Sequence, residues 1–182
     1  MSVRRFSFWF AAGLVMTLVA GLVDRADAQE LKAGDAAPGF ILKGSDGKTH
    51  SLADYKGKQA VVIAWFPKAF TGGCTAECKS FKENSDALKG LNVAYFTASC
   101  DDAETNKKFA ESLDLDYPIL SDPSKSIATA YGVVHPGRDV PERWTFYVGK
   151  DGKIAFVDRK VNTQKAGADL AAKIKELKLS GE

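Results

Sequence analysis

Two cysteines four residues apart are the first feature of this sequence that could do chemistry. They lie in the stretch AWFPKAFTGGCTAEC, residues 64–78, in which Cys74 follows a glycine pair and Cys78 is the last residue. A cysteine reacts as its thiolate, and a helix N-terminus or a nearby cation lowers a thiol pKa from about 8.5 to roughly 3.5–7.5. The spacing is open to three interpretations: a structural disulfide, a metal site, or a reactive thiol with a helper.

A helix that begins beside the glycine pair would make Cys74 the reactive member. Its sulfur would then face the free backbone N–H groups and the positive end of the helix dipole. Gly72 and Gly73 would let those amides approach a small ligand without a Cβ in the way. Cys78, one turn further on, is expected to be buried by the helix. With Cys100 the chain has three cysteines, and an odd number in an exported protein indicates a reactive thiol.

The N-terminus predicts export. Arg4 and Arg5 precede an apolar run over residues 6–23, and the triplet Ala-Asp-Ala at 26–28 supplies a small-residue cleavage site before Gln29. This order is typical of a secretory signal peptide, so residues 1–28 are expected to be removed and the mature chain to be periplasmic or secreted. The alternative is an uncleaved membrane anchor, because the apolar run reaches about 18 residues.

The remaining 154 of the 182 residues, 29–182, have the size of one domain. Three Arg and two Asp leave with the signal peptide, so the mature chain carries 22 basic and 21 acidic residues. Such a balance offers no electrostatic footprint for nucleic acid or for an anionic membrane surface. We therefore expect a single soluble domain with no stable membrane association after cleavage.

Apolar runs alternate with segments of helical period along this domain, as is typical of an α/β sheet. A hairpin is expected over residues 39–52, because Ser-Asp-Gly supplies turn chemistry between two alternating runs. Near-continuous apolar runs at 60–66 and 92–100 predict strands buried on both faces, as in a parallel sheet. A second hairpin over 144–158 turns at an Asp-Gly pair.

Helical periodicity predicts four helices, over residues 74–88, 103–113, 124–131 and 165–179. Asp101 and Asp102 are available as caps for the second of them. Two central parallel strands with flanking helices make a thioredoxin-like fold with a mixed sheet the simplest topology. In such sheets ligands bind beyond the carboxyl ends of the strands. Cys74 and Cys100 are both expected there, and Arg143 would enter from the facing loop.

The same residues carry a resemblance to a known family. Pro67, Thr71 and Cys74 in PKAFTGGC match the P-x-x-x-(T/S)-x-x-C signature of peroxiredoxins, and RWTFYVGKDGKI supplies Arg143. From about Ala33 onward the order of segments resembles the bacterioferritin-comigratory, or Q-type, branch. The resemblance implies a thioredoxin-like peroxiredoxin fold with an N-terminal β-hairpin.

The resemblance also implies a mechanism. Cys74 would attack the O–O bond of hydrogen peroxide or an alkyl hydroperoxide and become a sulfenic acid. Arg143 would stabilise the thiolate and the departing oxygen. The Thr71 hydroxyl and the Cys74 amide would hold the peroxide, Pro67 would limit water around the sulfenate, and Glu77 would orient the arginine. A thioredoxin-like or other thiol reductant would close an antioxidant cycle in a monomer or weak homodimer. No metal, flavin or nucleotide motif is present, so no cofactor is expected.

The sequence leaves the resolving thiol open. Many Q-type members carry that cysteine five residues after the peroxidatic one, whereas Cys78 follows Cys74 by four. Cβ atoms four residues apart on a helix lie about 5–6 Å from each other, beyond the roughly 3.5–4.5 Å of a disulfide. The first helical turn would therefore have to unwind. Cys100, at the end of the adjacent strand, is the rival partner, and an external thiol is the third alternative.

Two other functions fit parts of the pattern. The C-x-x-x-C spacing on this fold resembles the copper-carrying Sco proteins, and His135 could complete a Cys₂His site for copper(I) with Cys74 and Cys78. Lys79, however, stands where those proteins usually have a proline. A protein-disulfide reductase is the other alternative, although it normally uses C-x-x-C, which is absent from this sequence.

Overall fold

A seven-stranded mixed sheet with strand order β2-β1-β5-β4-β3-β6-β7 lies at the centre of the structure. The computed structural model describes residues 30–181, so the predicted signal peptide lies outside the described residues. Strand β4 pairs in parallel with β3 and with β5, and the other pairings are antiparallel. The strands are β1 (Ile41–Gly44), β2 (Thr49–Ser51), β3 (Val61–Trp65), β4 (Ala94–Ser99), β5 (Ile119–Ser121), β6 (Thr145–Val148) and β7 (Ile154–Asp158).

Most of the expected strands are confirmed. The N-terminal hairpin is β1 and β2, the two apolar runs form the parallel pair β3 and β4, and the second hairpin is β6 and β7. Strand β5 was not predicted, because three residues are too few to show a period. Since β5 pairs with both β4 and β1, it joins the N-terminal hairpin to the sheet.

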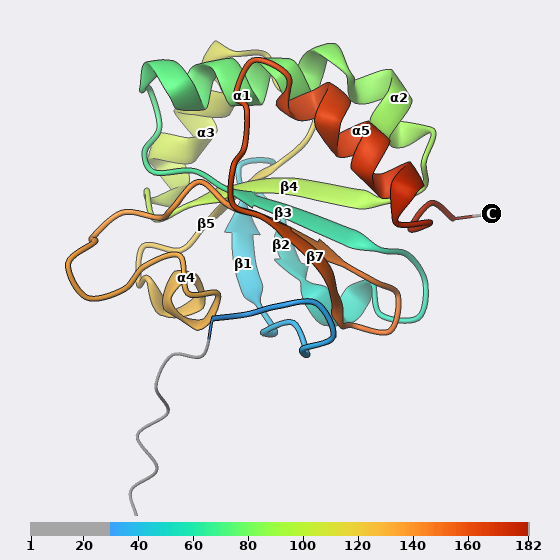
Figure 1. Cartoon of the computed structure of the whole chain (residues 1–182). Helices are drawn as coiled ribbons and strands as arrows, with labels where there is room; N and C mark the ends of the chain where they lie inside the picture. The colour runs from blue at the N-terminus through green and yellow to red at the C-terminus, as the bar shows by residue number, and fades with distance from the viewer. Residues whose placement is uncertain (1–29, 182) are drawn as a thin grey trace, which may run out of the picture.

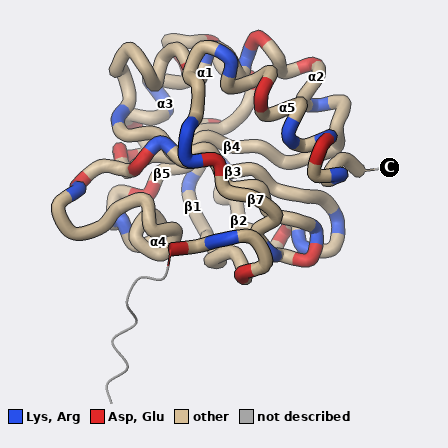
Figure 2. The backbone as a smooth tube through the Cα atoms, in the orientation of Figure 1, with Lys and Arg blue, Asp and Glu red and all other residues tan. Residues whose placement is uncertain are grey.

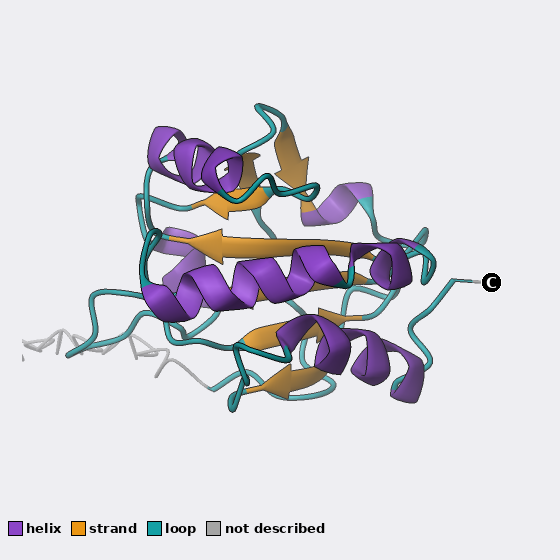
Figure 3. Cartoon of the chain, turned by 90° about the horizontal axis from the view of Figure 1, so that it is seen from above, coloured by secondary structure: helices purple, strands orange, loops and turns teal. Residues whose placement is uncertain are grey.

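Of the five α-helices within residues 30–181, four cover one face of the sheet, and α4 lies on the other (Figure 1). Seen from above, α1 lies between α3 and α5 and runs roughly along the long central strand (Figure 3). None of the helices among residues 30–181 combines the length and the apolar composition of a membrane-spanning segment. Basic and acidic residues are interspersed along the chain (Figure 2). The helices are α1 (Gly72–Glu83), α2 (Ser85–Lys89), α3 (Ala103–Ser112), α4 (Ser126–Ala130) and α5 (Ala166–Glu176), with a 3₁₀ turn at Leu52–Asp54.

The expected helix over residues 74–88 is two helices, α1 and α2, which meet at Asn84. The Asn84 backbone leaves the helical region (φ −107°, ψ 13°), and its side-chain amide donates to the Ser80 carbonyl at 2.8 Å. A side chain that bonds locally to the backbone in this way competes with the helix ladder. Periodicity alone did not reveal the break, because apolar residues continue on both sides of it.

The C-terminal half of α1 is anchored to its neighbours. Gly167 of α5 lies so close to α1 that a Cβ on it would stand 2.1 Å from the Ser80 carbonyl oxygen. The Gly167 N–H donates to the Ser80 hydroxyl at 3.0 Å, and the Tyr117 hydroxyl donates to the Cys78 carbonyl at 3.0 Å. The N-terminal half of α1 has no such ties to α5 among the described residues. Its position depends on the contacts of the site.

Candidate active site

Cys74 is the third residue of α1, directly beyond the carboxyl end of β3. Thr71 precedes the helix in an extended conformation (φ −93°, ψ 151°). The first N–H groups of a helix have no intrahelical acceptor, so they remain available to a ligand near the Cys74 sulfur. Cys74 itself is buried against the apolar side chains of α1, α3 and the end of β3. A small polar ligand would therefore contact the thiol at the boundary between the helix N-terminus and the apolar core.

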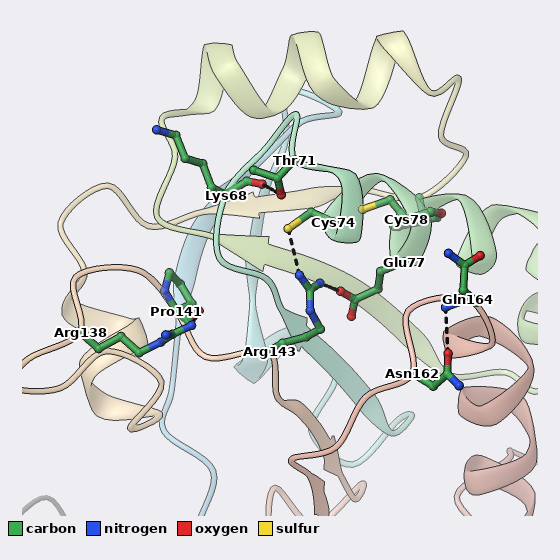
Figure 4. A network of polar contacts seen from close by, with 11 residues as sticks. Lys68, Thr71, Cys74, Glu77, Cys78, Arg138, Pro141, Arg143, Asn162 and Gln164 are labelled. Atoms are coloured by element: carbon green, nitrogen blue, oxygen red, sulfur yellow. Dashed lines mark hydrogen bonds and ion pairs between the residues drawn. The ribbon is translucent and has the colours of Figure 1, made fainter.

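Arg143 reaches Cys74 from the loop that precedes β6 (Figure 4). Its Nη2 donates to Cys74 Sγ at 3.3 Å, and its Nη1 forms an ion pair with Glu77. The absence of a side chain at Gly73 makes room for the guanidinium, since a Cβ there would lie 3.2 Å from Nη2. Cys74, Glu77 and Arg143 thus form one contact chain, built from two turns of α1 and the facing loop.

Arg143 stays positively charged in this group of three contacting side chains. Burial alone would lower the pKa of the Arg143 guanidinium, but Glu77 and Cys74 outweigh it and the pKa is raised. A protonated guanidinium at hydrogen-bond distance stabilises negative charge on a sulfur. It can equally stabilise charge that develops on an oxygen next to that sulfur. The arrangement therefore suits a thiolate nucleophile that attacks a substrate and displaces an anionic leaving group from it.

Glu77 is buried, and its burial opposes its charge. Desolvation raises the pKa of the Glu77 carboxyl to about 7, although Arg143 acts to lower it. Oxygen Oε2 pairs with Arg143, whereas the buried Oε1 has no hydrogen-bond partner among the described residues. A carboxyl in this position titrates close to neutral pH. The charge that orients Arg143 therefore depends on pH.

This burial predicts a pH-dependent contribution to stability. The Glu77 pKa is about 7 in the fold against an ordinary value of 4.5, so between these pH values the folded chain holds a proton that the unfolded chain has released. The stabilising contribution is full below pH 4.5 and is lost as the pH rises to about 7. The free energy of unfolding of wild type minus that of Glu77→Gln should fall by about 2–3 kcal/mol across this window.

Urea unfolding of the two proteins at a series of pH values measures this difference. Other titrating groups cancel in the comparison, because both proteins contain them. The charged neighbours that act on Glu77 are Arg143, which lowers its pKa, and Asp158, which raises it. A difference that stays constant over the window would show that Arg143 keeps Glu77 ionised and that burial does not dominate.

Thr71 and Pro67 lie on the loop between β3 and α1. Thr71 is exposed, and its hydroxyl donates to the Lys68 carbonyl at 2.9 Å (Figure 4) instead of capping α1. Its oxygen lone pairs remain free to accept from a ligand. Pro67 is half-buried, two residues after β3 ends. The loop therefore places a hydroxyl and a ring on the approach to Cys74.

The other two cysteines have different surroundings. Cys78 is buried in the same apolar cluster as Cys74, and burial raises the pKa of its thiol to about 12. Cys100 is half-buried and packs against the core on the α4 face of the sheet, where burial raises its pKa to about 11. All three cysteines are free thiols. Cys100 does follow the strand next to β3, as expected, but it belongs to a different core cluster from Cys74.

The described residues do not assemble the copper site considered above. His135 is exposed, and its Nε2 lies 3.4 Å from Glu142 Oε1. Within residues 30–181 there is no group of three or more His, Cys, Asp or Glu side chains placed to hold a metal ion. Arg143 instead occupies the space beside the Cys74 sulfur, where a cationic metal would be repelled.

Asp101 contacts the loop before Cys74, although the sequence predicted it as a helix cap. Of the two aspartates expected to cap α3, only Asp102 does so, by accepting from Thr105 N–H at 2.7 Å. Asp101 turns the other way and accepts from Ala69 N–H, in the loop before Cys74, at 2.8 Å. Nothing in the sequence distinguishes these adjacent aspartates, because the contact joins segments 32 residues apart.

Comparison with known proteins places this site in a family. Residues 33–157 match the model of the AhpC/TSA family. Peroxiredoxin Bcp of Escherichia coli is 36% identical over 133 residues, which cover 70% of this chain and 85% of that protein. Peroxiredoxin Bcp of Bacillus subtilis is 31% identical over 153 residues, covering 81% and 97%. The crystal structure of peroxidoxin BcpB from Mycobacterium tuberculosis superposes with a TM-score of 0.71 at 28% identity, covering 81% of this chain and 97% of that one. The chain therefore belongs to the AhpC/TSA family, with a thioredoxin-like fold, and is a peroxiredoxin-type thiol peroxidase.

Proposed function

We propose that Cys74 is the peroxidatic cysteine and that it reduces hydrogen peroxide or alkyl hydroperoxides as part of antioxidant defence. The observation that carries this assignment is the Arg143 guanidinium, which bonds to the Cys74 sulfur and pairs with Glu77. The burial of Cys78 and Cys100 supports it further, because burial keeps both of those thiols protonated.

The reaction begins when the Cys74 thiolate attacks one peroxide oxygen. An S–O bond forms as the O–O bond breaks, so the sulfur is oxidised to a sulfenic acid and the other oxygen leaves as hydroxide or alkoxide. Arg143 stabilises the charge on that leaving oxygen until it takes a proton from water. The Thr71 hydroxyl and the Cys74 N–H hold the peroxide in line, and Pro67 limits the access of water to the sulfenate.

Cys78 is the favoured resolving cysteine. It shares a core cluster with Cys74, whereas Cys100 packs against the core on the α4 face. Once unwinding of α1 exposes it to water and relieves the burial that keeps it protonated, the Cys78 thiol would attack the sulfenic acid, forming the S–S bond and releasing water. This step requires unwinding of α1 from Gly72 to Glu77, where two glycines weaken the helix. Cys78 can stay in place meanwhile, because Tyr117 holds its carbonyl and Gly167 holds the next turn.

The catalytic cycle is completed by an external reductant. A thiol reductant such as thioredoxin reduces the oxidised enzyme, in keeping with the family. Residues 1–28 act as a cleaved signal peptide that delivers the enzyme to the periplasm or the exterior, a proposal supported by the order of charged, apolar and small residues. The mature enzyme works as a monomer or weak homodimer, free of the membrane. The family chemistry needs no bound cofactor.

Intact-mass analysis after one equivalent of hydrogen peroxide tests this scheme. The reduced mature protein and its Cys100→Ser variant should each lose two hydrogen atoms within one turnover. The Cys78→Ser variant should instead gain one oxygen atom and react with dimedone, a trap for sulfenic acids. Loss of hydrogen that persists in Cys78→Ser and vanishes in Cys100→Ser would reassign the resolving role to Cys100. An oxygen gain in all three proteins would indicate an external resolving thiol.

A further inference from the structure

The loop from Pro67 to Thr71 has one side-chain tether. It joins β3 to α1 and leads directly into the peroxidatic cysteine. Asp101 Oδ2 accepts from the Ala69 N–H, in the middle of this loop, at 2.8 Å. Within residues 30–181, no other side chain from outside the loop is hydrogen-bonded to it. Apolar contacts also hold the loop, since Ala69 is buried in the core, but among the described residues this carboxylate is the one side chain from outside that fixes its backbone by a hydrogen bond.

Asp101 is itself held in place by a buried network. The Ser99 hydroxyl donates to the same Oδ2 at 3.0 Å, and the Asp101 N–H donates back to that hydroxyl at 3.2 Å. The Asn106 amide of α3 donates to Ser99 at 3.0 Å and to the Ser121 hydroxyl of β5 at 2.9 Å. Ser99 and Asn106 are fully buried. The carboxylate thus has a fixed place set by β4, α3 and β5.

The loop needs such a restraint because its backbone is strained next to the tether. Phe70 has φ +62°, a left-handed conformation that a bulky residue rarely adopts. The residue is 57% exposed, yet its ring packs on Phe109 of α3 with centroids 5.0 Å apart. Strained residues persist where the surroundings hold them from several sides, and such strain gathers at functional sites. Asp101 holds the residue before Phe70, and the Thr71 hydroxyl bond to Lys68 closes the loop after it.

We propose that Asp101 is a positioning residue for the peroxide reaction. It holds the loop so that the Thr71 hydroxyl and the first N–H groups of α1 converge on one point beside Cys74, and it touches neither the substrate nor the sulfur. This inference rests on the proposed role of Cys74. Alignment of this kind matters for a peroxide, which must be held in line for O–O cleavage. It matters much less for an alkylating agent, which needs only the thiolate.

The test compares these two reactions at one thiol. In a Cys78→Ser, Cys100→Ser background Cys74 is the one cysteine of the chain, so its single-turnover rate constants with hydrogen peroxide and with iodoacetamide can be measured across pH. Asp101→Ala should slow the peroxide reaction by about 10- to 100-fold, since small misplacements of reacting groups cost this much. Its iodoacetamide rate constant and pH profile should match those of the background.

Asp101→Asn provides the rescue. Its amide oxygen can accept from Ala69 N–H and from Ser99 as the carboxylate does, so the peroxide rate should return to within a few-fold of the background. Asp122→Ala is the matched control. Asp122 also uses its carboxylate to hold a backbone amide, that of Ala128 at 2.8 Å, but at α4 on the other face. Asp122→Ala should lose stability and keep the peroxide rate.

Two results would overturn the proposal. One is an unchanged peroxide rate in Asp101→Ala, and the other is an equal loss in both reactions, which would indicate general damage to the site. If Asp101→Ala does not fold, Ser99→Ala takes its place. It removes the second bond to the same oxygen and should show the same selective loss at smaller size, so equal rates there would again refute the role. Failure of the Cys74 assignment looks different, because the background protein itself would then not react rapidly with peroxide.

Discussion

Peroxide consumption by the Cys74→Ser variant should be no faster than that of dithiothreitol alone. We expect the enzymatic peroxide consumption to be lost completely. A serine hydroxyl does not ionise near neutral pH, so the exchange removes the nucleophile while leaving Arg143 in place. Neither of the other thiols can substitute for it, because burial raises their pKa to about 12 for Cys78 and about 11 for Cys100. The measurement is hydrogen peroxide consumption in dithiothreitol.

Cys100→Ser is the matched control for this prediction. It makes the same chemical exchange at a half-buried thiol that packs against the opposite core, and it should keep the wild-type rate. Unfolding in urea should show that both variants remain folded, since serine and cysteine are close in size. Consumption by Cys74→Ser above the dithiothreitol blank would mean that a second cysteine reacts with peroxide, and the single-nucleophile scheme would be wrong.

The three cysteines show what sequence could and could not predict about this site. The position of Cys74 in the first turn of α1 and the parallel pair β3 and β4 were predictable because local periodicity and the glycine pair encode them. The pairing of Arg143 with Cys74 was expected from strand order and from the family motif. The surroundings of Cys100 were not, because its exposure depends on α4, a helix of five residues that packs on the far face.

Contacts distant in sequence account for what was missed. The bond from Ala69 to Asp101 and the close approach of Gly167 to Ser80 leave no local pattern, since each joins segments far apart along the chain. Strand β5 is likewise defined by its partners, and three residues cannot show a period. The burial of Glu77 likewise depends on segments distant in sequence. Its position on α1 predicted a partner for Arg143, but a carboxyl pKa of about 7 arises only when the packed core removes water from it.

Arg143→Gln should slow the reaction of Cys74 with hydrogen peroxide by roughly 10²- to 10³-fold, the usual effect of removing a donor that stabilises charge in a transition state. The guanidinium contacts the Cys74 sulfur, and in the proposed mechanism it stabilises the charge that develops on the leaving oxygen. Arg143→Lys should recover little of this loss, because an ammonium cannot bond to the sulfur and to Glu77 with the same planar fork. Stopped-flow single-turnover kinetics measures the rate constant.

A change at Arg143 also strands a buried partner, and the two effects can be separated. Without Arg143, the Glu77 carboxyl is left buried and unpaired, which should cost roughly 3 kcal/mol of stability. The double variant Glu77→Gln, Arg143→Gln replaces the ion pair by two neutral amides that can bond to each other, so most of that stability should return. The peroxide rate should not return with it, because the positive charge beside the sulfur is still absent. If the double variant recovers the rate as well as the stability, Arg143 acts by holding α1 together. The charge on the leaving oxygen must then be stabilised by the N–H groups of the helix.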